Sequence, residues 1–457
     1  MSNPIDDRPQ TRSAGILLEI FSEMVHREAD FALLCGGDAD PLDTSSDIDL
    51  VLAKDPREVI DPILMHMQAL GKILVVQRLH YEVPYGYYYV VKVKIPDSSA
   101  EFLHLDCLHD PWGIGRYHLN SAFLLKDREA QAWGWRANRR REALYLLIKR
   151  AIKGEVTSEG IRALEQAFSD GRPNFWSEVE RWFGPKSKAL VDRLFAAQDR
   201  QECSVALSGL RRTLERRFRF RHPLRYIVGW SLSILRQWRR FLQPTGLFVV
   251  VLGPDGSGKS TVSGLVLRNL ERAFRRAWRF HWRPGLFRKL GRTANRHATG
   301  TDTPAETSKY HGFVSLARFI YYWLDFVIGY WVVIYPVMAR TGLVIGERYF
   351  PDVLVAPARY GFAVPQSLMR MAARLVPSPD LVILLKDEPE AIHARKAELA
   401  PAVIAELLQR YEAEAPRWGK CVTVSTAGGA PAVAATLANL ILKERAAKTA
   451  RRIGWTP

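Results

Sequence analysis

Short apolar runs alternate with longer stretches of helical spacing along the second half of the chain. The clearest run is LFVVVL at residues 247–252, and further runs lie at 343–345 and 381–385. Apolar runs of this length, bounded by turns, are typical of strands buried on both faces of a parallel sheet. Between them, apolar residues recur every three or four positions, as in helices that cover such a sheet. The pattern predicts an α/β fold with a doubly wound parallel sheet over residues 244–443.

The first part of the chain, residues 1–125, shows a different order of elements. Helical spacing over 15–26 is followed by two short strands within 31–52 and by a hairpin within 87–108. This order of elements differs from that of residues 244–443, so we expect a separate domain over residues 1–125. Its α+β class is implied by the resemblance described below.

The middle of the chain, residues 126–243, is helical and rich in arginine, and its last part combines an apolar stripe with basic residues. The apolar residues are Ile227, Trp230, Ile234, Trp238 and Phe241, and the basic ones are Arg236, Arg239 and Arg240. Such a helix can lie on an anionic membrane surface. It can also connect two domains while packed against its neighbours, and the sequence favours this second interpretation.

An apolar, aromatic stretch over residues 313–339 is nearly long enough to span a membrane. Arg318 and Asp325 interrupt this stretch, and a carboxylate inside a bilayer is costly. Strands precede and follow it, and strands of one sheet need short connections. We therefore expect a buried helix here rather than a transmembrane segment.

Composition constrains the partners and the location. The chain of 457 residues carries 65 Lys and Arg against 48 Asp and Glu, a formal net charge of +17. This excess predicts an anionic partner: phosphates, nucleic acid or an acidic membrane face. Four cysteines lie far apart without disulfide or metal spacing, and the N-terminus has no apolar signal region. We expect a cytoplasmic protein whose membrane contact, if any, is peripheral at the inner face, and a homodimer is compatible with the sequence.

The length predicts two or three domains. The composition shifts place an α+β domain at residues 1–125 and a basic helical connecting domain at 126–243. A third domain covers 244–443, after a clear break in the sequence QPTG at 243–246, and a basic tail follows at 444–457.

The turn after residues 247–252 carries a phosphate-binding pattern. Residues 253–260 read GPDGSGKS, the full Walker A sequence. Glycines let the backbone wrap closely around phosphate with its N–H groups pointing inward, and a helix N-terminus follows. Lys259 can reach the β and γ phosphates of a nucleotide, and the Ser260 hydroxyl can ligate Mg²⁺. The expected ATP-binding residues are Gly253, Pro254, Asp255, Gly256, Ser257, Gly258, Lys259, Ser260 and Thr261.

Further motifs follow this loop. Glu347-Arg348-Tyr349 ends a strand, and residues 379–390 contain a strand followed by Pro-Glu at a helix start. With the loop sequence GPDGSGKS, these motifs resemble the thymidylate kinase family of P-loop nucleoside monophosphate kinases. The family's Arg-Glu-Pro-Gly segment is matched only in part, by Arg283-Pro284-Gly285, and the residues with which the family recognises thymine have no counterpart here. The resemblance implies ATP and Mg²⁺ as cofactors and phosphoryl transfer as the reaction, and it supports thymidylate as acceptor only weakly.

The expected catalytic residues are Lys259, Arg348, Glu347, Arg283 and Arg395. Phosphoryl transfer depends on positioning and positive charge rather than on a covalent nucleophile. Arg348 and Arg283 would neutralise the acceptor and the developing charge, while Arg395 closes from the lid with Lys396. Glu347 would polarise an acceptor hydroxyl or hold Mg²⁺ through water.

The acceptor remains open between a nucleoside monophosphate and a phosphorylated sugar or lipid-linked glycan. The alternative from another class is a regulatory or nucleic-acid-binding protein that binds nucleoside triphosphates without turnover. Nucleic acid is not favoured as a partner, because the sequence contains no recognised nucleic-acid module.

The N-terminal domain carries a second set of candidate residues. Gly36-Gly37 precedes Asp47-Ile-Asp49 by about ten residues, and Asp106 lies on a later strand. Alternation places Asp47 and Asp49 on one face of a strand, and three such carboxylates suit a two-Mg²⁺ site. This pattern resembles the nucleotidyltransferases of the DNA polymerase β superfamily. The resemblance implies metal ligands at the three aspartates and a nucleotide loop at the glycines. Solvated acids at a strand end, or a domain that binds nucleotide without chemistry, are the alternatives.

Overall fold

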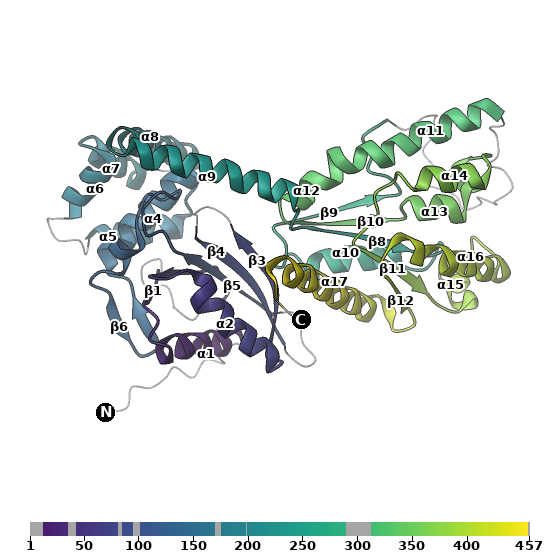
Figure 1. The fold of residues 1–457 in the computed structure, drawn as a ribbon, viewed down its shortest axis with the longest axis horizontal. Helices are drawn as coiled ribbons and strands as arrows, with labels where there is room; N and C mark the ends of the chain where they lie inside the picture. Colours follow the sequence, from purple (N-terminus) through teal and green to yellow (C-terminus); the bar gives the residue numbers. More distant parts are fainter. Residues whose placement is uncertain are drawn as a thin grey trace. The chain divides into compact units, whose positions relative to one another are not determined.

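The computed structural model divides the chain into two compact units, residues 1–238 and 239–457. It describes residues 12–34, 43–80, 85–94, 101–169, 175–197, 199–288 and 312–455. Each unit has a sheet of its own (Figure 1). The helical segment that we expected as a separate domain lies within the first unit up to residue 238. The chain is thus an α/β protein with one mixed and one parallel sheet, which agrees with the expected class.

The sheet of the first unit is mixed, in the order β3-β4-β5-β2-β1-β7-β6. The β2–β5 and β1–β7 pairs are parallel, and the other neighbours are antiparallel. Its strands are β1 Phe31–Leu33, β2 Ile48–Leu52, β3 Ile73–His80, β4 Tyr87–Val93, β5 Glu101–Leu108, β6 Glu129–Gln131 and β7 Gly134–Arg136. Because β2 and β5 are central neighbours, residues on their facing positions lie side by side.

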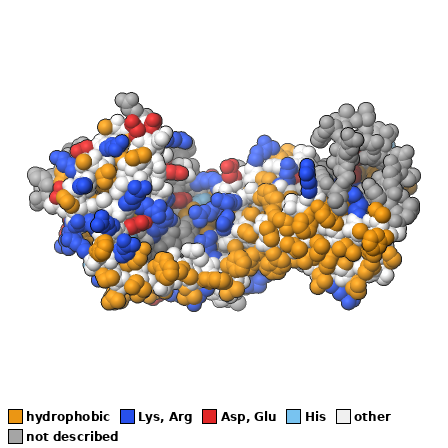
Figure 2. All heavy atoms as spheres, turned by 90° about the horizontal axis from the view of Figure 1, so that it is seen from above, with side chains coloured by type: hydrophobic (Ala, Val, Ile, Leu, Met, Phe, Trp, Pro, Cys, Tyr) orange, Lys and Arg blue, Asp and Glu red, His pale blue; other side chains and the backbone are white. Residues whose placement is uncertain are grey.

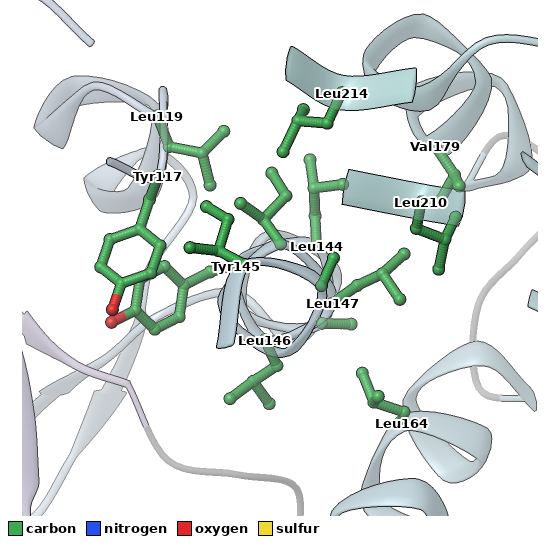
Figure 3. Close-up of a cluster of buried hydrophobic side chains, with 14 of the residues drawn as sticks. Tyr117, Leu119, Leu144, Tyr145, Leu146, Leu147, Leu164, Val179, Leu210 and Leu214 are labelled. Atoms are coloured by element: carbon green, nitrogen blue, oxygen red, sulfur yellow. The ribbon is translucent and has the colours of Figure 1, made fainter. Parts of the chain in front are cut away.

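Several helices of the first unit share one core with α4, Arg139–Lys153. The helices of this unit are α1 Arg12–His26, α2 Pro56–Ala69, α3 Ser121–Leu125, α4, α5 Ser158–Ser169, α6 Phe175–Phe183, α7 Ser187–Phe195, α8 Arg200–Arg221 and α9 Pro223–Leu242, and the last four residues of α9 belong to the second unit. Figure 3 shows Tyr145, Leu146 and Leu147 pointing from α4 in different directions. Every residue from Glu142 to Lys149 is buried, so all sides of this part of α4 face the core, although both of these end residues are charged.

The sheet of the second unit is parallel throughout, in the order β12-β11-β8-β10-β9. Its strands are β8 Leu247–Leu252, β9 Arg276–His281, β10 Gly342–Glu347, β11 Leu381–Lys386 and β12 Cys421–Ser425. Every residue of β8 is buried, as the continuous apolar run predicts. Connections leave β8 for one side of the sheet and later return to its other side, which creates the type of edge where ligands bind in open α/β sheets.

Helices lie on both faces of this sheet, with α11 and α13 on one face and α10 and α17 on the other (Figure 1). They are α10 Lys259–Asn269, α11 Gly312–Gly329, α12 Tyr335–Ala339, α13 Phe350–Val355, α14 Gln366–Ala373, α15 Pro389–Arg395, α16 Pro401–Glu414 and α17 Gly429–Ile453, with a π-helical turn at Tyr330–Ile334. The basic tail expected from residue 444 is not separate, because α17 continues through it.

The apolar stretch that we expected as a buried helix has two different faces. Phe319, Tyr322 and Phe326 pack into the core of the second unit, whereas Phe313 and Trp331 are exposed. Gly312–Ala339 is long and apolar enough to cross a membrane by length and composition, and less than half of its most apolar part is buried. Figure 2 shows hydrophobic side chains gathered on the face of the second unit that carries α11. The expectation of a buried helix thus holds for one face only.

The helix α9 also differs from the favoured interpretation. We expected a connecting helix packed on its neighbours, but no residue of α9 is buried. Most of its large apolar side chains are exposed, Trp230 and Trp238 among them. Apolar spacing alone predicts a helix and an apolar face, but it does not reveal what covers that face.

Candidate functional site

The Walker A residues form a tight loop between the central strand β8 and the helix α10. Gly253, Gly256 and Gly258 have φ angles of +145°, +87° and +83°. A Cβ atom on Gly253 would lie 2.8 Å from the Leu385 carbonyl oxygen, and one on Gly256 would lie 2.9 Å from that of Ile392. Only glycine fits both the backbone conformation and the space, so the loop can hold its N–H groups close to a ligand.

Lys259 is folded back onto this loop. Its Nζ donates to the carbonyl oxygens of Gly253 at 2.8 Å and Pro254 at 2.7 Å, and the residue is only 6% exposed. Burial lowers the pKa of Lys259 to about 8. The loop carbonyl oxygens therefore fix the position of the ammonium group, but burial leaves this group less well solvated than it would be in water.

Ser260 is joined to the end of the neighbouring strand. Its hydroxyl donates to Glu347 Oε2 at 2.6 Å, and Glu347 is the register partner of Val251 on β8. Arg279 Nη1 and His281 Nδ1 also lie 3.2 and 3.4 Å from this carboxylate. Burial raises the pKa of Glu347, but hydrogen bonds from His281 and Ser260 bring it below its ordinary value. The site therefore contains a hydroxyl that is hydrogen-bonded to an ionised carboxylate, and the oxygens of both groups are suited to bind Mg²⁺.

Arg348 follows Glu347 with a φ of +62°, a conformation that is strained for a residue other than glycine and is often found at functional sites. Its guanidinium pairs with Asp255 of the loop, and Arg359 pairs with the other oxygen of Asp255 at 3.2 Å. Burial raises the pKa of Asp255, but Arg348 and Arg359 bring it below its ordinary value. The buried Nε of Arg348 has no hydrogen-bond partner among the described residues. The strained backbone thus places Arg348 against the loop, where its Nε–H group is available to a ligand.

A buried carboxylate supports the second arginine. Asp352 is fully buried and lies 3.3 Å from Arg359 Nη1, and it accepts hydrogen bonds from the hydroxyls of Tyr360 and Tyr411. The sequence analysis missed Arg359 and Asp352. No motif marks them, and the sequence PARYGF at residues 357–362 gives only a turn signal.

Arg283 belongs to an aromatic group beside these residues. It pairs with the fully buried Asp325 of α11, and Asp325 also accepts the backbone N–H groups of Gly285 and Phe287. Asp325, which interrupts the apolar stretch, therefore stabilises the turn after β9. The ring of Trp282 stacks on Tyr360 with centroids 4.7 Å apart and an angle of 8°.

Arg395 and Lys396 do not contact the loop through their charged groups. Arg395 pairs with Asp387, and its Nη1 donates to Thr426 at 2.9 Å. Lys396 Nζ lies 2.9 Å from Glu398. Their expected role in closing the site would require both to exchange these partners.

In the first unit, the parallel register places Asp49 of β2 beside Asp106 of β5. Asp47 stands just before β2, is half exposed, and accepts a hydrogen bond from Tyr88 at 2.9 Å. Lys149 of α4 donates to Asp49 Oδ2, so the sheet and the central helix together form this group. The expected nucleotide loop, Gly36 and Gly37, lies outside the described residues.

The ammonium group of Lys149 contacts Asp49 where a metal ion was expected. Burial lowers the pKa of Lys149, but Asp49 and Asp106 bring it above its ordinary value. Within the described ranges, no group of three His, Cys, Asp or Glu side chains is arranged to hold a metal ion. The Oδ1 atom of Asp49 is buried and has no hydrogen-bond partner there.

Comparison with models of known protein families gives no match, and comparison with curated proteins gives none either. The chemistry of both sites is therefore inferred from their own residues. The structure brings together the loop, Glu347 and Arg348, which the sequence analysis named, and adds Arg359, which it did not.

Proposed function

We propose that the second unit is a P-loop phosphotransferase that moves the γ-phosphate of ATP to an anionic acceptor. The observation that carries the proposal is the group at the carboxyl ends of β8 and β10. There the loop lysine, Ser260 hydrogen-bonded to Glu347, and Arg348 paired with Asp255 lie around one glycine-rich turn. The motifs that resemble those of thymidylate kinases support the same proposal, because the residues of this group belong to these motifs.

The residues suit ATP and Mg²⁺. The positive φ angles of Gly253, Gly256 and Gly258 would let the loop direct backbone N–H groups toward a phosphate at the start of α10, where phosphate binds favourably. Ser260 would hold Mg²⁺, with Glu347 accepting from its water ligands. The metal ion, when bound, would neutralise charge on the β- and γ-phosphate oxygens.

Different side chains would bind the ATP and the molecule that accepts its phosphoryl group. Lys259 would exchange the carbonyl oxygens of the loop for the phosphate oxygens of ATP, which are stronger acceptors for an ammonium group. Arg348 and Arg359 would hold the acceptor's anionic group in line with the γ-phosphate. An acceptor oxygen forms a bond to the γ-phosphorus while the bond to the β–γ bridging oxygen breaks, and ADP leaves.

The acceptor is a nucleoside monophosphate or a phosphorylated sugar or glycan. The stacked rings of Trp282 and Tyr360 beside the arginines suit a flat or cyclic group on the acceptor. Production of ADP from ATP, measured with a panel of nucleoside monophosphates and phosphorylated sugars, tests the proposal. Turnover stimulated by one acceptor class supports it. Tight ATP binding without turnover for any acceptor favours the regulatory alternative.

A second candidate activity is nucleotidyl transfer by the first unit. The observation that favours it is the neighbouring register of Asp49 and Asp106 on parallel strands. Lys149, in contact with Asp49, would have to yield its place to a metal ion or bind the phosphates itself. A change in metal binding when Lys149 is replaced tests this point, as set out in the Discussion.

A further inference from the structure

We propose that α9 (Pro223–Leu242) binds an anionic lipid surface by lying in the plane of the membrane interface. The inference does not depend on the proposed phosphotransferase activity. It rests on the exposure of the helix, on the angular distribution of its residues and on its charge.

One face of α9 is apolar and open to solvent. Within the first unit, the exposed large apolar residues of α9 are Leu224, Ile227, Val228, Trp230, Leu235 and Trp238, each between 46% and 78% exposed. At about 100° per residue, they fall within an arc of about 160°. Soluble helices normally bury such an arc, and helices that lie in a membrane interface have one with tryptophan among its residues.

The opposite face of the same helix is seated on the first unit. A Cβ atom on Gly229 would lie 2.2 Å from the carbonyl oxygen of Ile114, so the backbone of α9 approaches that loop closely. Gly229 lies about 180° from the centre of the apolar arc on a helical wheel. Within the first unit, the contact therefore turns the arc away from the residues that hold the helix.

The charge of the region is uniformly positive. Residues 216–242 contain eight arginines and no aspartate or glutamate. On the wheel, Arg239 and Arg225 lie about 20° and 60° beyond the Val228 edge of the apolar arc, and both are exposed, whereas Arg236 and Arg240 lie on the side of Gly229. The long side chains of Arg239 and Arg225 can reach lipid phosphates while the apolar arc enters the acyl boundary.

Charge complementarity favours an anionic lipid surface over the other partners that could cover this face of α9. A second copy of the chain would bring arginine-rich flanks together without acidic partners on α9. Nucleic acid would pair with the arginines but would leave the apolar arc in water. A transmembrane course would place several arginines inside the bilayer, which is costly. An anionic bilayer surface satisfies both the apolar arc and the arginine flank.

Flotation of the full-length protein with lipid vesicles tests the proposal. The vesicles are phosphatidylcholine alone, or phosphatidylcholine with about one third phosphatidylglycerol. Two double variants probe the surface: Trp230→Ser with Trp238→Ser, and Arg225→Glu with Arg239→Glu. Matched controls are Val25→Ser with Met65→Ser, at exposed apolar residues of α1 and α2, and Arg370→Glu with Arg374→Glu, at the end of α14 and at the residue after it. Circular dichroism checks that each variant is folded.

We expect the wild-type protein to float with the anionic vesicles and to be released by 1 M salt. Each α9 variant should lose at least tenfold in vesicle affinity, since each arginine near an anionic surface contributes roughly a fivefold factor. The controls should bind as the wild type does.

Three results would overturn the proposal. They are no binding to anionic vesicles, equal loss in the α9 variants and the controls, and release from membranes only by detergent. Light scattering of the same proteins adds a further such result. A dimer that the tryptophan variant abolishes would assign the face to a second copy instead.

Discussion

At the scale of single residues, the most informative group is the ammonium of Lys259. The loop carbonyls hold it in position, and burial lowers its pKa to about 8. A phosphate ligand would supply the negative charge that this environment lacks. The site is therefore arranged so that nucleotide binding stabilises the charged form of a buried lysine.

This arrangement predicts that ATP binding takes up protons at pH 8. A folded-state pKa of about 8 leaves Lys259 half neutral at that pH, and bound phosphate should restore the pKa toward its ordinary value of 10.5. Binding should then take up about half a proton per ATP at pH 8 and nearly none at pH 6.5. Titration calorimetry in two buffers of different ionisation enthalpy measures the uptake. Equal binding enthalpies in both buffers at pH 8 would contradict the assignment.

Lys149 provides a residue-scale test in the first unit. Its ammonium group neutralises Asp49, so we expect Lys149→Met to expose a site for a divalent cation. In the absence of nucleotide, the variant should bind Mn²⁺ at least tenfold more tightly than the wild type, as measured by electron paramagnetic resonance. Lys153→Met, at the exposed end of α4, is the matched control. Tight Mn²⁺ binding by the wild type, unchanged in Lys149→Met, would show that the lysine does not occupy the cation position.

The sequence predicted the residues that local chemistry dictates and missed those that depend on tertiary contacts. The loop glycines and Lys259 follow from a contiguous pattern, and the strand before them from an apolar run. Lys149 and Asp49 are 100 positions apart and meet only because α4 is central to the core. Neither spacing nor propensity reveals such a meeting.

At the scale of elements, a ring stack connects α8 to the loop after β5. His118 stacks on Phe218 with centroids 3.8 Å apart and an angle of 17°. Burial lowers the pKa of His118 to about 4. The folded unit therefore holds this imidazole neutral under conditions where the unfolded chain would protonate it.

The stack predicts a loss of stability in mild acid. With a pKa of about 4 in the folded state and 6.5 as the ordinary value, the unfolded state binds more protons between these two values, so stability falls as the pH falls through that window. Between pH 7.5 and pH 5, the free energy of unfolding of the first unit should fall by about 2 kcal/mol from this group. His118→Phe, which keeps a ring in the stack, should reduce that fall. Denaturant unfolding at both pH values measures it, and an equal fall in the variant would assign the effect to other groups.

The elements themselves were more predictable than their surroundings. The strand expected at residues 247–252 is β8, and the helix expected at 15–26 is α1. The burial of α9 and α11 was not predictable, because an apolar face with helical spacing has the same pattern whether it meets a core, a membrane or solvent.

At the scale of the whole molecule, the chain consists of two units with separate cores. One core is built around α4 (Figure 3), and the other around β8, α11 and α13. Separate cores of this size can unfold separately. The division also means that a ligand of one unit need not stabilise the other.

Calorimetry should therefore resolve two unfolding transitions that respond differently to nucleotide. Mg²⁺–ATP at about 100 times its dissociation constant should raise the melting temperature of the second unit by about 5–10 °C, because only its folded form binds. The transition of the first unit should move less, and the shift of the second should vanish in Lys259→Ala. A single transition, or a shift confined to the first unit, would contradict this division of binding.

The central claim is that the loop around Lys259 transfers a phosphoryl group, and transfer of the labelled γ-phosphate of ATP to the acceptor measures this most directly. Lys259→Ala removes the charge together with the hydrogen bonds to the Gly253 and Pro254 carbonyl oxygens, so circular dichroism checks the fold of the variant. Lys443→Ala, at an exposed position of α17, is the control. We expect Lys259→Ala to lower the rate of phosphorylated product formation by about 100-fold to 1,000-fold, while the control and the fold remain unchanged. Undiminished product formation by folded Lys259→Ala would contradict it.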